Sequence, residues 1–249
     1  MSNHVIVRDA ASDEADVVGS LLRRSFPPEW LVSSIYSHPW GDRRLAEILS
    51  SEPSQRASRI RIASLNGSAV GCTVVDPVAG HLDYIAVLPE LNGGGIGGLL
   101  LADAESSAPG PLSLDVFADN EAARGWYRRH RYEDNGGRRS VTVLDVAALV
   151  GATAPVGSAP GEKDVAVHGF APARAVGDAC SVDVVLYGED RLRVRSWDGA
   201  DLLHALSLVS STWSTRPVVC LLDVDARSTA SLVRWEGTLV RMVRSSRDA

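Results

Sequence analysis

Residues 84–101 read Tyr-Ile-Ala-Val-Leu-Pro-Glu-Leu-Asn-Gly-Gly-Gly-Ile-Gly-Gly-Leu-Leu-Leu, and this stretch decides the fold. An apolar strand runs through a proline-marked turn into a glycine cluster, and an apolar helix follows. Glycine has no side chain to block a ligand, and the N–H groups in the first turn of a helix lack partners inside the helix. The stretch therefore predicts an anion cradle that suits a phosphate-bearing cofactor.

Two nucleotide-binding motifs contain glycine clusters of this kind. A P-loop is excluded, because no Gly-Lys-Ser/Thr follows the glycines. A dinucleotide fingerprint G-x-G-x-x-G does fit Gly93, Gly95 and Gly98, and Asp115 lies near the distance expected of a ribose-binding acid. In a Rossmann unit, however, the first glycine turns directly off the strand, whereas five residues separate Val87 from Gly93. The spacing disfavours that interpretation.

The stretch from Leu82 to Leu100 resembles the strand, turn and helix of the GNAT (Gcn5-related) N-acetyltransferase family, in which Val-x-Pro precedes Arg/Gln-x-x-Gly-x-Gly/Ala. Asn92, Gly95 and Gly97 occupy the three defining positions, and Asn92 replaces the usual Arg or Gln. A second stretch, Asn-Glu-Ala-Ala-Arg-Gly-Trp-Tyr at residues 120–127, is similar to the family's Asn-x-x-Ala followed by an aromatic-Tyr pair. The family's closing Gly-Phe is Arg-Tyr here, and the resemblance covers about residues 4–145.

The resemblance implies a mixed, mostly antiparallel sheet flanked by helices, of α/β (α+β) class, with acetyl-CoA (coenzyme A) as cosubstrate. In the family the central strand splays from its neighbour, so its backbone is free to bind pantetheine, and the pyrophosphate lies over the glycines and the helix dipole. The residues implied to bind the cofactor are Ile85, Ala86, Val87, Asn92, Gly93, Gly94, Gly95, Ile96, Gly97, Gly98 and Asn120. Asn120 also suits a helix N-cap, and the two roles are compatible.

Acyl transfer needs a base for the amine and an acid for the leaving thiolate. Tyr127 is the candidate acid, since a phenol with a pKa near 10 stays protonated at neutral pH; its alternative role is packing against the sheet. His81 and Asp83 alternate along one face of the strand that leads to the thioester, and both are candidate bases. The alternatives are a hydrogen-bonded histidine at the strand end, a structural ion pair for the aspartate, and a base relayed by water.

Composition limits the remaining classes. The chain has 249 residues, 45% of them apolar, and a formal charge of −6, which disfavours nonspecific binding to nucleic acid. No apolar run approaches the length of a membrane span and no signal-peptide core is present, so the cytoplasm is expected. Cys72, Cys180 and Cys220 are odd in number and far apart, which predicts packing residues rather than a disulfide or a metal site.

Local signals predict the order β-α-α-β-β-β-α-β-α-β up to residue 144, with a hairpin at Asn66-Gly67. Residues 1–146 are the predicted GNAT-like domain and residues 147–161, low in charge and rich in Ala, Gly, Ser and Pro, the predicted linker. Residues 162–249 are the predicted second, smaller α+β domain; they show no family resemblance and no internal repeat of the first. The ranges predicted there are strands at 164–168, 181–187, 191–196 and 218–222 and a helix at 201–209, with residues 231–243 left open between helix and hairpin.

The sequence thus predicts an acetyl-CoA-dependent N-acetyltransferase. The charge favours a primary amine on a small molecule as acceptor, such as an antibiotic or metabolite in self-resistance. The alternative is a degenerate GNAT fold that senses acyl-CoA and is coupled to the second domain, since Asn92 and Arg131 depart from the family pattern. No nucleic-acid or membrane partner is expected, and a homodimer through residues 162–249 is a further hypothesis. The acceptor, the acyl chain length and the role of the second domain stay open.

Overall fold

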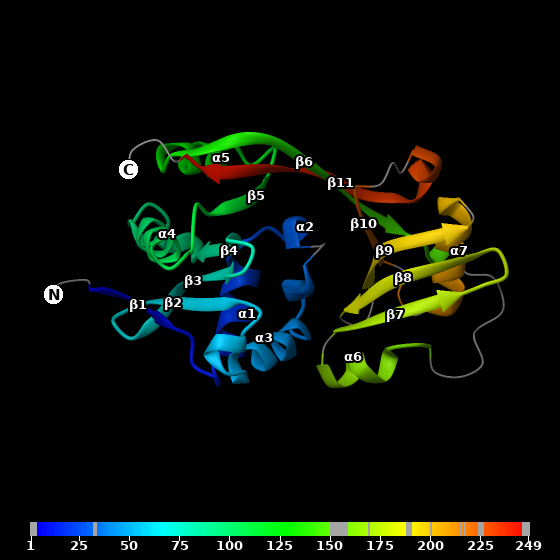
Figure 1. Ribbon diagram of the computed structural model, residues 1–249, viewed down its shortest axis with the longest axis horizontal. Helices are drawn as coiled ribbons and strands as arrows, with labels where there is room; N and C mark the ends of the chain where they lie inside the picture. The colour runs from blue at the N-terminus through cyan, green and yellow to red at the C-terminus, as the bar shows by residue number, and fades with distance from the viewer. Residues whose placement is uncertain are drawn as a thin grey trace. The chain divides into compact units, whose positions relative to one another are not determined.

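The computed structural model describes residues 4–31, 34–149, 159–168, 170–187, 191–199, 201–214, 216, 218–223 and 227–245 (Figure 1). It contains two compact units. The first unit comprises Met1–Pro28, Leu45–Arg138 and Leu239–Ala249, and the second comprises Glu29–Arg44 and Arg139–Thr238. Most of the predicted linker, residues 150–158, lies outside the described residues, and the domain limits at 146 and 162 stay predictions.

The sheet of the first unit has the strand order β1-β2-β3-β4-β5-β11-β6. The strands are β1 (Val5–Asp9), β2 (Arg59–Leu65), β3 (Ser68–Asp76), β4 (His81–Val87), β5 (Ser113–Phe117), β6 (Tyr132–Asp145) and β11 (Val233–Arg244). Strands β6 and β11 contribute residues to both units. Pairing is antiparallel from β1 to β4 and between β5 and β11, and parallel between β4 and β5. The predicted mixed, mostly antiparallel sheet is confirmed.

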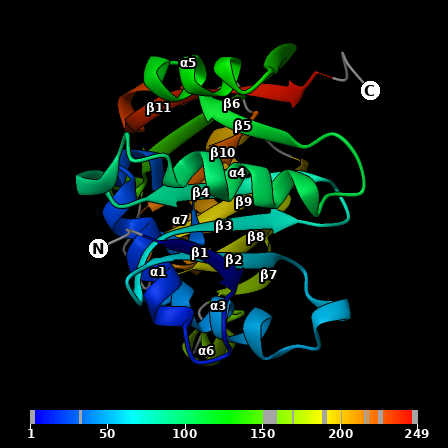
Figure 2. The same ribbon diagram turned by 90° about the vertical axis from the view of Figure 1, so that its left-hand side faces the viewer.

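The helices between residues 15 and 129 follow the predicted order, with one short helix in addition, and the parts of them within Glu29–Arg44 belong to the second unit. They are α1 (Ala15–Ser25), α2 (Pro28–Leu31), α3 (Gly41–Ser50), α4 (Ile96–Ser106) and α5 (Glu121–Arg129), with short 3-10 turns η1 (Ile35–Ser37), η2 (Pro53–Gln55) and η3 (Pro89–Leu91). Figure 1 shows α4 on one side of β3 and β4 and α1 on the other, and Figure 2 looks onto α4 in front of these strands. Both faces of β3 are therefore covered, which explains its unbroken buried run from Val70 to Val75. No helix in the described part of the chain is long and apolar enough to cross a bilayer.

The predicted hairpin joins β2 to β3. Asn66 and Gly67 both have positive φ, 52° and 84°, as a two-residue type I′ turn requires. Leu65 then pairs with Ser68, and the strands continue in antiparallel register. This turn sets the register of the two strands that precede β4.

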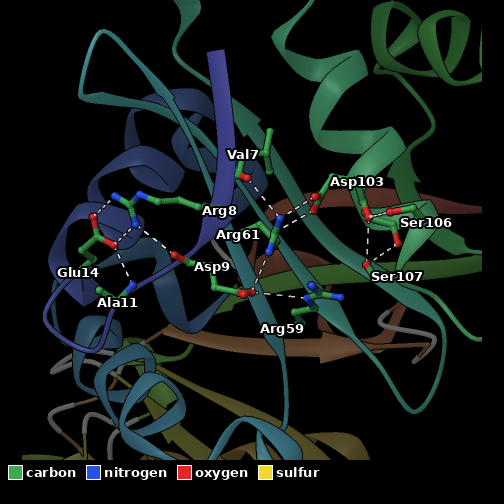
Figure 3. A network of polar contacts seen from close by, with 11 residues as sticks. Val7, Arg8, Asp9, Ala11, Glu14, Arg59, Arg61, Asp103, Ser106 and Ser107 are labelled. Atoms are coloured by element: carbon green, nitrogen blue, oxygen red, sulfur yellow. Dashed lines mark hydrogen bonds and ion pairs between the residues drawn. The ribbon is translucent and has the colours of Figure 1, made fainter. Parts of the chain in front are cut away.

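A network of ion pairs ties the first strands to their helices (Figure 3). The Arg61 side chain on β2 donates to Asp103 on α4 at 2.7 Å and lies 3.1 Å from a carboxylate oxygen of Asp9 on β1. Burial alone would raise the Asp9 pKa, but Arg61 and Arg59 hold it below its usual value. Because Arg61 is only 14% exposed, it joins three elements from a partly buried position.

Replacing Arg61 with Met is expected to destabilise the protein by about 2 kcal/mol, since the Asp103 carboxylate, only 21% exposed, loses its charged donor, while the more exposed Asp9 keeps Arg59. The measurement is the urea midpoint of unfolding. The Arg8→Met variant is the control, because the Arg8–Glu14 pair, at 2.6 Å, has 43% of the arginine exposed and should contribute less than about 1 kcal/mol. Equal losses in the two variants would contradict this interpretation.

The second unit has the strand order β6-β10-β9-β8-β7. Its further elements are η4 (Ala147–Leu149), α6 (Glu162–His168), β7 (Phe170–Val176), β8 (Cys180–Tyr187), β9 (Arg191–Gly199), α7 (Leu202–Thr212), β10 (Val218–Leu222) and η5 (Arg227–Leu232). One core joins them, and in it Trp213 is buried and its indole N–H donates to the Pro160 carbonyl at 2.9 Å. Cys72, Cys180 and Cys220 are free and buried, as predicted for packing residues.

The second unit repeats the topology of the first, contrary to the expectation that no repeat exists. In the first unit the antiparallel strands β2, β3 and β4 are followed by α4 and by β5, which is parallel to β4. In the second, the antiparallel strands β7, β8 and β9 are followed by α7 and by β10, which is parallel to β9. A β-bulge interrupts the last antiparallel pair in both units. The repeat lies in the order of elements and was not predicted from the sequence.

Three local predictions for the second unit need correction. The strand predicted at 164–168 is the helix α6, because Glu162 in its first turn pairs with the buried Arg216 at 2.8 Å and acidic residues there suit the helix dipole. Strand β7 was missed because it contains Pro172; β7 is the edge strand, where a residue without an N–H is tolerated. Residues 233–244 form neither a helix nor a hairpin but the strand β11, whose later part joins the first unit.

Candidate cofactor and active site

The glycine cluster forms the connection from β4 through η3 to α4. Gly95 is the N-cap of α4, with φ 81° and no side-chain cap, and Gly93 has φ 83°. A Cβ added at either position would meet nothing within 4 Å, so the space above this turn is open. Leu99 N donates to Gly95 O at 3.2 Å, which leaves the amides of the three preceding helical residues at the free end of the helix. The arrangement is a cradle of N–H groups that suits an anion.

At positions 97 and 98 glycine is favoured for a different reason, the close approach of a neighbouring helix. A Cβ at Gly97 would lie 3.3 Å from the Trp126 ring, and one at Gly98 would lie 3.7 Å from His130. Trp126 and His130 are themselves in contact on α5, with ring centroids 4.5 Å apart. These two glycines therefore let α4 approach α5, and only their backbone amides face the free helix end.

Strands β4 and β5 separate beside the cradle. Their described pairs are His81 with Ser113 and Leu82 with Leu114, at the start of both strands. On its other edge β4 stays paired with β3 as far as Val87. The segment 85–87 therefore has one edge without a described strand partner, and its alternate amides are available there. Binding of pantetheine along this edge stays a prediction.

One of the two candidate bases lies in a β-bulge. Val75 pairs with Leu82 and Val74 pairs with Tyr84, so Asp83 is the extra residue on β4. This bulge breaks the regular alternation that predicted a shared face for His81 and Asp83. A single-residue insertion of this kind has no signal in the sequence pattern.

His81 lies in a polar setting at the start of the splay. Its Nδ1 is 2.9 Å from Ser113 Oγ, and its Nε2 is 3.9 Å from Asp115 Oδ2. The His81 and Asp115 side chains are 17% and 13% exposed. Ser113 was not among the predicted site residues, and Asp115 was considered only as a ribose-binding acid. Alternation along β5 opposite His81 could have identified both, had the parallel pairing been known.

Asp83 is the second titratable group here. Desolvation by the surrounding protein, followed by the charges of Asp76 and Asp115, raises the pKa of Asp83 to about 6. Its side chain is nevertheless exposed at the surface. The carboxylates of Asp76 and Asp115 therefore lie near Asp83, around the start of β4.

Tyr127 lies on α5 and is buried in the core between α5 and the sheet. It is 8% exposed and packs against Trp126 and Tyr132, with ring centroids 5.0 and 5.7 Å away. Burial raises its pKa above the usual value, so the phenol stays protonated at neutral pH. The structure thus shows the packing role, and the general-acid role stays a prediction.

Asn120 and Asn92 flank the two helices of the site. The Asn120 side chain is the N-cap of α5 and accepts from Ala123 N at 3.1 Å, so the capping role is confirmed. Its contact with a cofactor stays a prediction. Asn92 is exposed at the end of η3, beside the cradle, where a side chain shorter than Arg or Gln reaches less far.

The helix α7 in the second unit corresponds to α4, but it begins differently. Asp201 is the N-cap of α7, and its carboxylate accepts from His204 N at 3.0 Å. This hydrogen bond from the backbone lowers the Asp201 pKa, so the group stays ionised. A negative side chain therefore occupies the helix end that is bare at Gly95, and the second unit does not offer a cradle of the same kind.

Comparison with known proteins identifies the class. Residues 18–132 match the model of the acetyltransferase (GNAT) family. A tandem GNAT protein from the clavulanic acid biosynthesis pathway shares the fold with a TM-score of 0.64 and 11% identity, over 99% of this chain and 100% of that one. A GCN5-related N-acetyltransferase from Sphaerobacter thermophilus does so with a TM-score of 0.56 and 13% identity, over 98% of each chain. No curated protein matches the sequence.

Residues 18–132 are accordingly a GNAT acetyltransferase domain, and the chain as a whole has the tandem GNAT fold. The predicted family is confirmed, and the repeat of the second unit, which the sequence did not reveal, is part of the same fold. Members of this family are typically acetyl-CoA-dependent enzymes.

Proposed function

We propose that the protein is an acetyl-CoA-dependent N-acetyltransferase that acts on the primary amine of a small molecule, as in antibiotic or metabolite self-resistance. The observation that carries this proposal is the coincidence of two features in one unit. The bare N-terminus of α4 at Gly95 adjoins the edge of β4 that β5 leaves unpaired after Leu82. An extended pantetheine and a pyrophosphate need such a pair of sites, one after the other.

The residues present fit coenzyme A. The open space at Gly93 and Gly95 admits the pyrophosphate, and the amides that begin α4 would donate to it. The backbone of residues 85–87 would bind pantetheine through its free edge. Acetyl-CoA would supply the acetyl group as a thioester at this edge. The bare N-terminus of α4 and the capped N-terminus of α7 favour a cofactor site in the first unit over one at the corresponding helix of the second.

His81 is our candidate for the base. It would accept a proton from the acceptor's ammonium group, for which a neutral imidazole near pH 7 is suited. Asp83 is the alternative base, and otherwise its exposed carboxylate would attract the cationic acceptor. Tyr127 would hold a proton for the departing sulfur. The net charge of −6 also favours a cationic acceptor.

A cytoplasmic location and a homodimer stay predictions.

The direct test is thiol release from acetyl-CoA in the presence of a panel of primary amines. We expect at least one cationic amine to accelerate release above the rate of hydrolysis, with an acetylated product seen by mass spectrometry. Binding of acetyl-CoA by calorimetry is measured in parallel. Binding without acceleration by any amine would favour the alternative, an acyl-CoA sensor coupled to the second unit.

The two candidate bases can be separated by their pH profiles. A base acts unprotonated, so kcat/KM falls as the pH drops through its pKa. We expect His81→Gln to lower kcat/KM about 100-fold and Asp83→Asn to raise KM for the amine while keeping the acid-side decline. If Asp83→Asn instead abolishes a decline centred near pH 6, where its carboxyl titrates, Asp83 is the base.

A further inference from the structure

The strand β11 places an arginine against Asp115, the aspartate that lies beside the candidate base His81. Arg241 pairs with Asp115 of β5 in the strand register. Its Nε and Nη2 donate to the two carboxylate oxygens of Asp115, the second at 2.9 Å. This bidentate geometry fixes the plane of the carboxylate as well as its position. All of these residues belong to the first unit.

The register of β11 is set so that Arg241 faces Asp115. Val240 and Met242, its neighbours on either side, are fully buried on the opposite face. A shift by one residue would expose them and bury the arginine, so the sequence pattern permits one register. On β6, Gly137 leaves room for the arginine: a Cβ there would lie 3.0 Å from Arg241 Cβ. The position is therefore built for this side chain.

The Asp115 carboxylate is shared between Arg241 and His81. Its Oδ2 accepts from Arg241 and lies 3.9 Å from His81 Nε2, while Ser113 Oγ holds the other ring nitrogen. The charged groups described beside Asp115 are His81 and Asp83 from β4 and Arg241 from β11, and Asp76 from β3 lies near Asp83 in turn. Among these groups Arg241 is the cation.

We propose that Arg241 is a positioning residue, which holds the Asp115 carboxylate in place beside His81 and thereby keeps His81 neutral. The inference rests on the proposed function, with His81 as the base. Paired with Arg241, the Asp115 carboxylate lies 3.9 Å from the imidazole without imposing its full negative charge on it. Without Arg241, that charge acts on His81 alone, which favours the protonated imidazole, and protonated imidazole cannot accept a proton from the substrate.

The test compares Arg241→Met with a matched control on the same strand. Arg244→Met also removes one positive charge and one ion pair from β11, but its partner is Glu105 on α4, away from His81. For Arg241→Met we expect the acid limb of kcat/KM to move upward by about one pH unit and kcat to fall about 10-fold. The acetyl-CoA Kd should not change. Arg244→Met should keep the parent pH profile, and Arg241→Lys, which retains the charge, should show little of the shift.

Titration of the His81 ring by NMR, assigned with His81→Gln, tests the inference without turnover. An upward shift of the imidazole titration in Arg241→Met and not in Arg244→Met supports it, even if no amine is acetylated and the proposed function fails. An unchanged titration in Arg241→Met, or equal shifts in both variants, overturns it. A loss of stability alone, with the titration unmoved, would likewise reduce Arg241 to a structural ion pair.

Discussion

A Gly95→Asp variant is expected to bind acetyl-CoA at least about 100-fold more weakly than the parent protein. The substitution places a carboxylate at the bare N-terminus of α4, where the pyrophosphate is proposed to lie, and like charges at this short range repel strongly. It also reproduces in the first unit the side chain that Asp201 supplies at the start of α7. Isothermal calorimetry with acetyl-CoA is the measurement.

The Gly67→Asp variant is the matched control. Gly67 has φ 84°, close to the 81° of Gly95, and neither position has an atom within 4 Å of an added Cβ. Both variants therefore gain one negative charge and about 1 kcal/mol of backbone strain. Gly67 lies in the turn between β2 and β3, so Gly67→Asp should bind acetyl-CoA like the parent. If Gly95→Asp bound acetyl-CoA as tightly as the parent protein, the pyrophosphate would not lie at the N-terminus of α4.

A Tyr127→Phe variant is expected to lower kcat about 100-fold with little change in the Kd of acetyl-CoA. Removing the phenolic proton abolishes general-acid assistance to the leaving sulfur, which contributes at least that factor in comparable reactions. The ring keeps its packing against Trp126 and Tyr132, so the fold should persist. Steady-state kinetics of thiol release and a thermal melt give the two readouts.

Tyr132→Phe serves as the comparison. Tyr132 lies in the same core, and its hydroxyl donates to Glu105 at 3.1 Å, a structural hydrogen bond. Its loss should cost about 1 kcal/mol of stability and leave kcat unchanged. If Tyr127→Phe behaves in the same way, with normal turnover, Tyr127 is a packing residue and another group protonates the thiolate.

The sequence predicted the first unit well because its signals are local. The turn at Asn66-Gly67, the glycine cluster and the N-cap at Asn120 each depend on the conformation of a few neighbouring residues. The same holds for the strand and helix limits around β4 and α4. These features could be recognised without knowing which segments meet in space.

What the sequence did not predict depends on distant segments. Arg241 and Asp115 form an ion pair although they are 126 positions apart in the chain, and the pattern of residues 231–243 does not indicate which residue Arg241 contacts. The bulge at Asp83 appears only when β3 and β4 are paired. The repeat in the second unit escaped because the residues that mark the first, the glycines before α4, are replaced there by an aspartate cap.

The late strand also bears on the order in which the protein folds. During synthesis, strands β1 to β6 are made first. Strand β11, which lies between β5 and β6 in the sheet, is made only after the other strands of the second unit. A fragment that ends at residue 146 would leave two unsatisfied strand edges at that gap, which invite association with other chains. The sheet of the first unit is therefore complete only when residues 239–244, which follow the second unit in the chain, have been made.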